Sequence, residues 1–392
     1  MQPTSPEPGM PPAEQPLLTT SLGSLLVSFL KIGSIGFGGG MAVIALMEKE
    51  LVQSRRLIPP DDFVHGVGLG QGLGAFAVNV AVFAGYRLFG AGGALLSAGA
   101  FLLPSVILVV VLSDLYFRYH AIPALQSAVA GLSPVVVALI LSAAWSIARR
   151  SLRSWPAALI AMAAFIAGVY HVNAAWVLLG AGAVGFLLPL KVSPPGEPAP
   201  PDKGKKAVMP LLLLAAPVAT SLPVIVATFL KIGLVFFGGG FVLVPILQHR
   251  LVTELGWLKP QEFLDGLAIS NLAPGPVALL ATFAGYRLAG VPGALAATVS
   301  LFAPGILLML VISRQYSLFR NDRRVQRFLA GVNPSVAGLL VSATPVLGRG
   351  AFESWRAYVL LALSFALLVG LRWPPAFVLA IGAIAGYFAL LP

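Results

Sequence analysis

The residues of this chain best suited to bind a ligand are glycines set inside apolar segments. Three consecutive glycines close the motifs GFGGG and FFGGG, and each glycine costs a helix interior up to about 1 kcal/mol. A helix broken there would turn free backbone N–H groups toward a cavity, where they would bind an anion. Close packing of helices through small residues is the alternative explanation. The candidate glycines are Gly38, Gly39, Gly40, Gly238, Gly239 and Gly240.

Basic side chains accompany both glycine triplets. Lys31 and Lys231 precede the triplets by one to two helical turns, and a lysine at membrane depth is costly unless it reaches the interface or faces water. Each lysine therefore either snorkels to the membrane surface or faces a central anion site. Arg87 and Arg287 end two GYR motifs and suit either a bidentate grip on an oxyanion or an anchor at the membrane border.

The segment ISNLAPGP interrupts another apolar stretch. Because proline removes a donor and disfavours helix before it, we expect the helix to open from Asn271 through Pro274 and Gly275 to Pro276. The opening would expose backbone groups and place the asparagine amide beside the break. The equivalent stretch LGQGLGAF has Gln71 in place of the asparagine and no proline, so the duplicated site should be asymmetric. A purely structural kink is the alternative.

Carboxylates able to carry a coupling proton are few. Asp61, Asp62 and Glu262 follow prolines at expected helix starts and are predicted to be helix caps. Asp265 precedes the proline break by a few residues and is therefore the candidate for proton coupling. With no cysteine and four histidines, thiol chemistry is excluded, and neither a metal site nor a cofactor is expected. No nucleophile–base pair or phosphate loop supports an enzyme.

The composition places these residues in a membrane protein. Of the 392 residues 58% are hydrophobic and 10% charged, and the mean hydropathy of +0.92 excludes a soluble globular protein. Apolar runs such as 92–117 and 173–190 predict membrane-spanning helices. The net charge of +11 fits basic cytoplasmic loops and anionic membrane lipid, and does not require a nucleic acid. We expect an all-α polytopic membrane protein with about 10–12 transmembrane helices, some broken by glycine or proline.

An internal duplication organises the chain. Residues 29–155 align with 229–355 without a gap, and about one position in three is identical. Residues 41–88 and 241–288 are too interrupted to assign to crossings, and a re-entrant hairpin is one arrangement they allow. The predicted organisation is a disordered tail (1–17), a first domain (18–191), a cytoplasmic linker rich in proline and lysine (192–207) and a second, homologous domain (208–392).

Basic residues are distributed oppositely in equivalent loops of the two halves. The loop at 149–153 holds three arginines, whereas the loop at 349–356 has two arginines and a glutamate. The loop at 319–328 holds four arginines, whereas the loop at 118–124 has one. Because basic loops face the cytoplasm, equivalent loops should lie on opposite sides of the membrane. The two domains are therefore predicted to be inverted repeats.

Four motifs together resemble the chromate ion transporter family in its two-domain form: FGGG after a lysine-bearing helix, GWLKPQEF, APGP and GYR. The resemblance implies a multi-pass protein of the bacterial or archaeal plasma (inner) membrane that exports chromate at the expense of the proton gradient. The family's FGGG positions fall on the two glycine triplets, and its PGP positions on Pro274, Gly275 and Pro276. Where the family commonly has a second PGP, this chain has Gly74, Ala75 and Phe76.

The same residues leave several alternatives open. Chromate and sulfate are tetrahedral dianions of similar size, so a sulfate or other anion transporter fits these donors as well. An uncoupled anion channel fits them too, and a homodimer is allowed.

The inverted arrangement predicts the location of two segments. Reporter domains fused within the linker and after Arg327 should both report the cytoplasm, because the linker and the loop at 319–328 are the basic ones. Reporter activity of the two fusions in whole cells measures this, with a fusion after Arg118 as the control expected outside. A periplasmic signal from either of the first two fusions would refute the inversion.

Overall fold

A computed structural model gives the fold, and the residues it describes are helices joined by short turns. Every regular element within the described residues is helical, which confirms the predicted all-α class. Gly38, Gly39, Gly238 and Gly239, the tail and the linker lie outside the described residues. The described ranges are 20–37, 40–72, 75–119, 123–170, 172, 174–187, 221–236, 240–314, 323–347 and 354–388.

The helices repeat at an interval of 200 residues. The first repeat consists of α1 (Leu22–Ile35), α2 (Gly40–Glu48), the π-helix η1 (Lys49–Ser54), α3 (Pro60–Gly72), α4 (Phe76–Tyr119), α5 (Pro123–Ser151), α6 (Trp155–Val169) and α7 (Ala174–Leu187). The second consists of α8 (Leu222–Leu234), η2 (Gly240–Val242), α9 (Leu243–Leu247), the π-helix η3 (Gln248–Glu254), α10 (Pro260–Leu272), η4 (Val277–Leu279), α11 (Leu280–Arg314), α13 (Arg323–Leu347), α14 (Trp355–Val369) and α15 (Pro375–Tyr387). The duplication of sequence is therefore a duplication of structure.

The longest helices, α4 and α11, each fold back on themselves. Their backbones leave the helical conformation just before Gly90 and Gly290, where φ is 64° and 59°. In α11 the hydroxyls of Thr282 and Thr298 share a hydrogen bond of 2.7 Å, although a straight helix would separate these residues by about 24 Å. Each helix therefore has two antiparallel arms, 76–88 and 91–119 in α4, and 280–288 and 291–314 in α11.

The first arm of α4 or α11 also pairs with the helix before it. A Cβ atom placed on Gly66 would lie 2.3 Å from the ring of Phe83, and one on Gly266 the same distance from Phe283, so these helices touch at equivalent points. The segments 60–88 and 260–288 are thus helical hairpins, named here hairpin 60–88 and hairpin 260–288. Their arms are about 20 Å long, which is shorter than the roughly 30 Å of membrane hydrocarbon.

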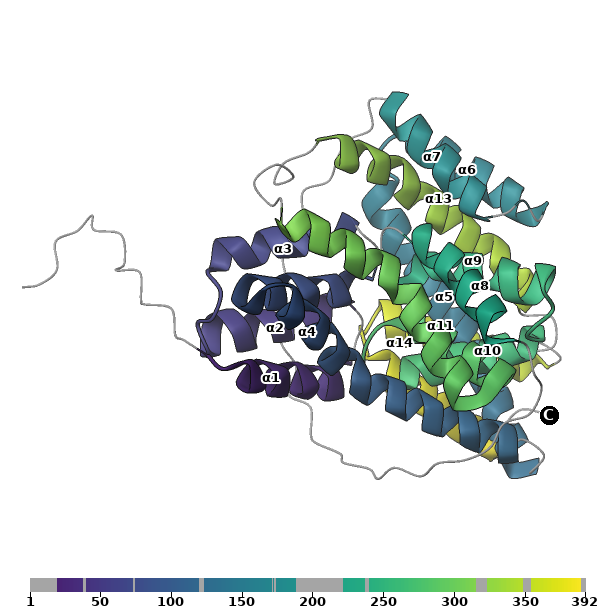
Figure 1. The fold of residues 1–392 in the computed structure, drawn as a ribbon. Coiled ribbons are helices and arrows are strands. Elements are labelled where there is room, and N and C mark those ends of the chain that lie inside the picture. The colour runs from purple at the N-terminus through teal and green to yellow at the C-terminus, as the bar shows by residue number, and fades with distance from the viewer. Residues whose placement is uncertain are drawn as a thin grey trace, which may run out of the picture.

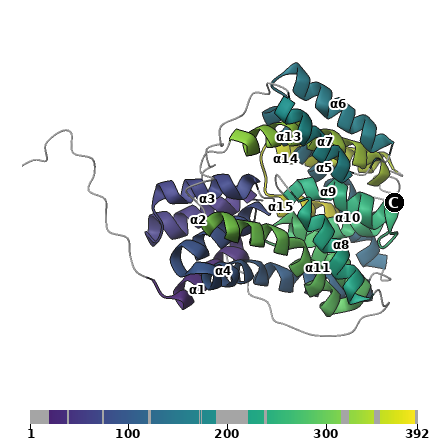
Figure 2. The same ribbon diagram turned by 45° about the horizontal axis from the view of Figure 1, so that its top comes forward.

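The two repeats interlock. Helix α13 packs against α6 and α7, whereas its counterpart α5 packs against α15 and α14, and α4 packs against α11. Figures 1 and 2 both show α13 of the second repeat lying beside α6 and α7 of the first. Glycines allow the close approach: a Cβ on Gly131 would lie 2.1 Å from the Gly382 oxygen, and one on Gly331 2.0 Å from the Ala181 oxygen. Each repeat therefore completes the packing of the other.

Apolar helices cover the outside. Helices at 76–119, 130–151 and 277–314 are long and apolar enough to cross a membrane, and six shorter apolar helices accompany them among the described residues. Aromatic side chains at the ends of the short helices are exposed, as in the aromatic belts at membrane interfaces. These residues are Trp155, Tyr170, Trp176, Trp355 and Tyr387. This surface is that of an integral membrane protein.

The fold of α11 predicts the effect of two glycine substitutions. Gly285→Ala should lower the free energy of unfolding by about 1–3 kcal/mol, because its Cβ would lie 2.3 Å from the Gly293 oxygen in the opposite arm. Gly99→Ala is the matched control, since nothing lies within 4 Å of a Cβ there and the equivalent residue is the exposed Val299. Thermal unfolding in detergent measures both. Equal midpoints for the two variants would contradict the folded-back arms.

Candidate functional site

The proline break of the second repeat lies against the end of α1 in the first. Helix α10 ends at Leu272 and η4 begins at Val277, so the helix opens as the prolines predict. The Gly275 N–H donates to the oxygen of Gly36 at 3.0 Å, and Gly36 is the residue that ends α1. Gly275 has a φ of 111°, and a Cβ there would lie 2.8 Å from the Ser105 Oγ. The tip of hairpin 260–288 thus meets the start of the first glycine motif.

This contact uses the only N–H of the PGP segment. Pro274 and Pro276 have none, and that of Gly275 is donated to Gly36, so in this conformation the segment joins two broken regions and leaves no N–H for an anion. The Asn271 side chain donates from Nδ2 to the Leu267 oxygen of its own helix at 2.8 Å. Its Oδ1 is an acceptor and therefore does not attract an anion.

Only the last glycine of each triplet belongs to the described residues. Gly40 begins α2 and Gly240 begins η2, so each triplet ends at a helix start. A helix start is where N–H groups lack partners within the helix. The two earlier glycines of each triplet, and the side chain of Gln71, lie outside what the structure describes.

The two lysines differ in their surroundings. Lys31 pairs with Glu50 at 2.9 Å, and Arg55 binds the same carboxylate at 3.0 Å. In the second repeat the residue equivalent to Glu50 is Arg250, which pairs with Glu254. No ion pair of Lys231 occurs among the described residues. Of the two lysine ammonium groups, that of Lys231 is therefore the one without a carboxylate neighbour in the described part.

Both predicted arginines hold the open ends of the hairpins. Arg87 pairs with Asp62 in hairpin 60–88, and Arg287 Nε binds Glu262 Oε1 at 3.2 Å in hairpin 260–288. Glu262 also accepts the backbone N–H of Lys259 at 2.8 Å, which confirms its predicted role as a helix cap. These ion pairs join the two arms of each hairpin at the end opposite the tip.

Asp265 lies in the contact between the repeats. It is 2% exposed, and its carboxylate accepts hydrogen bonds from the Tyr116 hydroxyl at 2.6 Å and from Gln261 Nε2 at 2.9 Å. Gln261 also contacts the hydroxyl of Ser133 at 2.7 Å. Tyr116 on α4 and Ser133 on α5 belong to the first repeat. The buried carboxylate of Asp265 thus has two neutral hydrogen-bonding partners, of which Tyr116 comes from the opposite repeat, and Ser133 of that repeat is linked to it through Gln261.

A second carboxylate of this contact, Asp114, lies close by. Tyr286 of the second repeat donates its hydroxyl to Asp114 at 2.6 Å, and Arg118 binds the same oxygen at 2.7 Å. The ring of Phe117, on the same helix as Asp114, stacks on two rings of the second repeat, with centroid distances of 5.1 Å to Phe283 and 6.2 Å to Tyr286. Asp114 is the one charged residue in the apolar run 92–117, and a lone charge in such a run is a sequence feature that could have marked it as a functional residue. Tyr116 and Gln261 carry no comparable signal.

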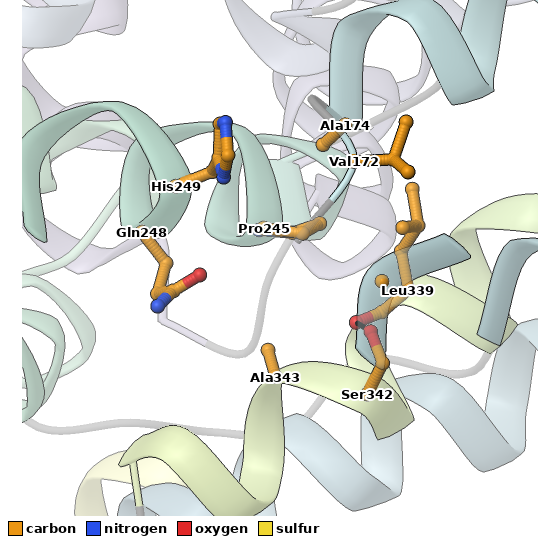
Figure 3. A pocket seen from close by; sticks show the side chains of 9 residues that line it. Val172, Ala174, Pro245, Gln248, His249, Leu339, Ser342 and Ala343 are labelled. Atoms are coloured by element: carbon orange, nitrogen blue, oxygen red, sulfur yellow. Dashed lines mark hydrogen bonds between the residues drawn. The ribbon is translucent and has the colours of Figure 1, made fainter. Parts of the chain in front are cut away.

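A small pocket lies apart from these residues. Figure 3 shows Gln248 and His249 of η3 facing Leu339, Ser342 and Ala343 of α13 across it. Its volume of about 20 Å³ has room for roughly one water molecule and not for a tetrahedral oxyanion. None of the predicted binding residues lines it.

Broken helices that meet between two interlocked repeats, inside a shell of apolar helices, define an integral membrane protein of the transporter class. The family model described as chromate transporter matches residues 23–186 and again 224–387. The chain therefore belongs to the chromate transporter family, a family of ion transporters, and the predicted resemblance is confirmed.

Relatives match along nearly the whole chain. A probable chromate transport protein of Synechococcus elongatus is 30% identical over 385 residues, covering 93% of this chain and 95% of that protein. A chromate transport protein of Cupriavidus metallidurans is 28% identical over 365 residues, covering 90% and 88%. An uncharacterized transporter of Methanocaldococcus jannaschii is 26% identical over 383 residues, covering 94% of each chain. No solved structure matches.

The contact between Gly275 and Gly36 predicts a sensitive position. Gly275→Ala should destabilise the protein by about 1–2 kcal/mol or more, because an alanine disfavours this positive φ and its Cβ would crowd Ser105. Adding Ser105→Gly, the residue found at the equivalent position 305, should restore part of the loss by removing the crowding hydroxyl. Thermal unfolding in detergent compares the variants. No difference between the single and double variants would argue against the Ser105 contact.

Proposed function

We propose that this protein is a secondary active transporter that exports chromate, or a similar tetrahedral oxyanion, across the bacterial or archaeal plasma membrane at the expense of the proton gradient. Membership of the chromate transporter family and the printed names of its relatives support the substrate class. The observation that carries the mechanism is the meeting of the PGP break with the end of α1 between the two repeats. Transporters built from repeats bind substrate where such broken helices meet.

The proposed binding site combines cations with backbone donors. Lys231 is the cation we expect an incoming anion to meet first, because the other three predicted cations are held by carboxylates. Lys31, Arg87 and Arg287 each have an acidic partner in this conformation. An oxyanion that replaces such a carboxylate keeps the cation paired, so the exchange avoids leaving a lone charge at membrane depth.

Backbone donors would complete the site after a rearrangement. The N–H of Gly275 becomes available to an anion only when its bond to Gly36 opens. The glycine triplets are the second proposed source of N–H groups. Asn271, through the second hydrogen of its Nδ2, and Gln71 are proposed to orient the anion. Binding and the opening of the contact between Gly275 and Gly36 are thereby linked, as alternating access requires.

Asp265 is the proposed proton-coupling group. Its burial and its neutral hydrogen-bond partners place a titratable group between the two repeats. Proton relays in membrane transporters use carboxylates in such buried positions. A proton taken up there would act directly on the contact that joins the repeats.

Chromate flux into inside-out membrane vesicles tests the proposal. Labelled chromate uptake should rise when a proton gradient is imposed, and an excess of sulfate should leave a large part of that uptake in place. Uptake that follows only the electrochemical gradient of the anion would indicate an uncoupled channel. Flux abolished by sulfate would indicate a sulfate transporter, and no flux would rule out a chromate exporter.

The same vesicles test Lys231. Lys231→Met should abolish gradient-driven uptake while the protein still inserts into the membrane, because the anion loses the cation that has no ion pair among the described residues. Lys49→Met is the control, since Lys49 is exposed on η1 and is not among the proposed binding residues. Full uptake in the Lys231 variant would remove this residue from the site.

A further inference from the structure

Two tyrosine hydroxyls, one from each repeat, donate hydrogen bonds across the contact to a carboxylate of the other repeat. Tyr116 of the first repeat donates to Asp265 of the second, and Tyr286 of the second donates to Asp114 of the first, each at 2.6 Å. Asp114 and Tyr116 lie on the second arm of α4, while Asp265 and Tyr286 lie on the two arms of hairpin 260–288. The two bonds therefore tie the same helix to the same hairpin.

The two carboxylates in these bonds have different electrostatic surroundings. Asp114 is partly exposed and pairs with Arg118 at 2.7 Å, so it has a cation beside it. Asp265 is buried and has no ion pair among the described residues. The bond from Tyr286 therefore ends on a carboxylate that is already paired with a cation, whereas the bond from Tyr116 ends on a carboxylate that has no ion pair in the described part of the chain.

The charged groups around Asp265 are few and mostly paired with others. On its own helix Glu262 binds Arg287 of α11, and Gln261 is neutral. On η3, His249 and Arg250 both pair with Glu254. From α4 and α5 the groups that face it are Tyr116 and, through Gln261, Ser133. Helices α13 and α15 place no charged group in ion-pair contact with it in the described part.

We propose that Tyr116 is the positioning residue that converts protonation of Asp265 into a loosening of the contact between the repeats. A hydrogen bond to an ionised carboxylate is roughly twice as strong as one between neutral groups. Protonation of Asp265 therefore weakens the tie from Tyr116, while the tie from Tyr286 to Asp114 persists. The inference rests on the proposed function, in which Asp265 carries the coupling proton.

The loosening reaches the substrate site through a rigid arm. Asp265 and the proline break belong to the same hairpin, and α10 runs without interruption from Pro260 to Leu272. The tip of this hairpin carries Gly275, whose N–H is bound to Gly36. A change at Tyr116 and Asp265 therefore acts on hairpin 260–288, whose tip forms the contact between the two breaks. The bond from Tyr286 to Asp114 holds the hairpin at its other end.

The pH profile of chromate flux in proteoliposomes tests Tyr116 against a matched control. Tyr116→Phe keeps the ring and removes the donor to ionised Asp265, so the midpoint of the profile should move to higher pH by about one unit. Tyr286→Phe removes the other hydroxyl between the repeats and should leave the midpoint unchanged, because that hydroxyl binds Asp114 and not Asp265. Asp265→Asn should flatten the profile, and adding Tyr116→Phe to it should change nothing further.

The outcomes separate this inference from the function on which it rests. A wild-type protein that transports chromate without any response to protons overturns both. A proton-coupled wild type whose midpoint is unchanged in Tyr116→Phe, or equally shifted in Tyr286→Phe, overturns the role of Tyr116 alone. Should Tyr116→Phe fail to accumulate, 3-fluorotyrosine at position 116 replaces it. Its more acidic hydroxyl is a stronger donor, and it should move the midpoint to lower pH, whereas an unchanged midpoint would contradict the proposal.

Discussion

The structure depends on one constraint, which is that backbone polar groups inside a membrane must be satisfied by other protein groups. Prolines open the helix ahead of Val277, and the end of α1 leaves further backbone groups without helical partners. The hydrogen bond from Gly275 to Gly36 satisfies a backbone N–H at the proline break and a backbone carbonyl at the end of α1. Because the two groups come from different repeats, satisfying the backbone also joins the two halves at the proposed substrate site.

Glycine makes the required approaches possible. Gly85 and Gly285 lie against the carbonyl groups of Gly93 and Gly293, where any side chain would collide with backbone. These contacts fold α4 and α11 into paired arms, of which the first, 76–88 and 280–288, is too short to cross the membrane. The glycines that pack α5 and α13 against helices of the opposite repeat act in the same way between repeats. Small residues thus replace the hydrophobic driving force that lipid cannot supply.

The repeats share a fold and differ in their ionisable groups. Glu50, which neutralises Lys31, has Arg250 as its counterpart, and Asp265 has His65. The carboxylate of Asp114 likewise has Arg314 as its counterpart. Duplication therefore supplies a symmetric scaffold, and substitution places the buried carboxylate and the proline break in the second repeat, together with the lysine that has no ion pair among the described residues. In the proposed function this asymmetry separates the anion site from the proton site.

The sequence by itself determined the class, the duplication and the places where helices break. Apolar runs, the constant interval between repeats and the prolines before Val277 act locally, so their consequences can be read without knowing what lies next to them. The tertiary structure decided the pairings. Tyr116 reaches Asp265 across 149 positions of sequence, and Arg287 binds Glu262 because a hairpin brings its two arms together. Such contacts depend on how helices cross and interlock, which no local pattern of residues specifies.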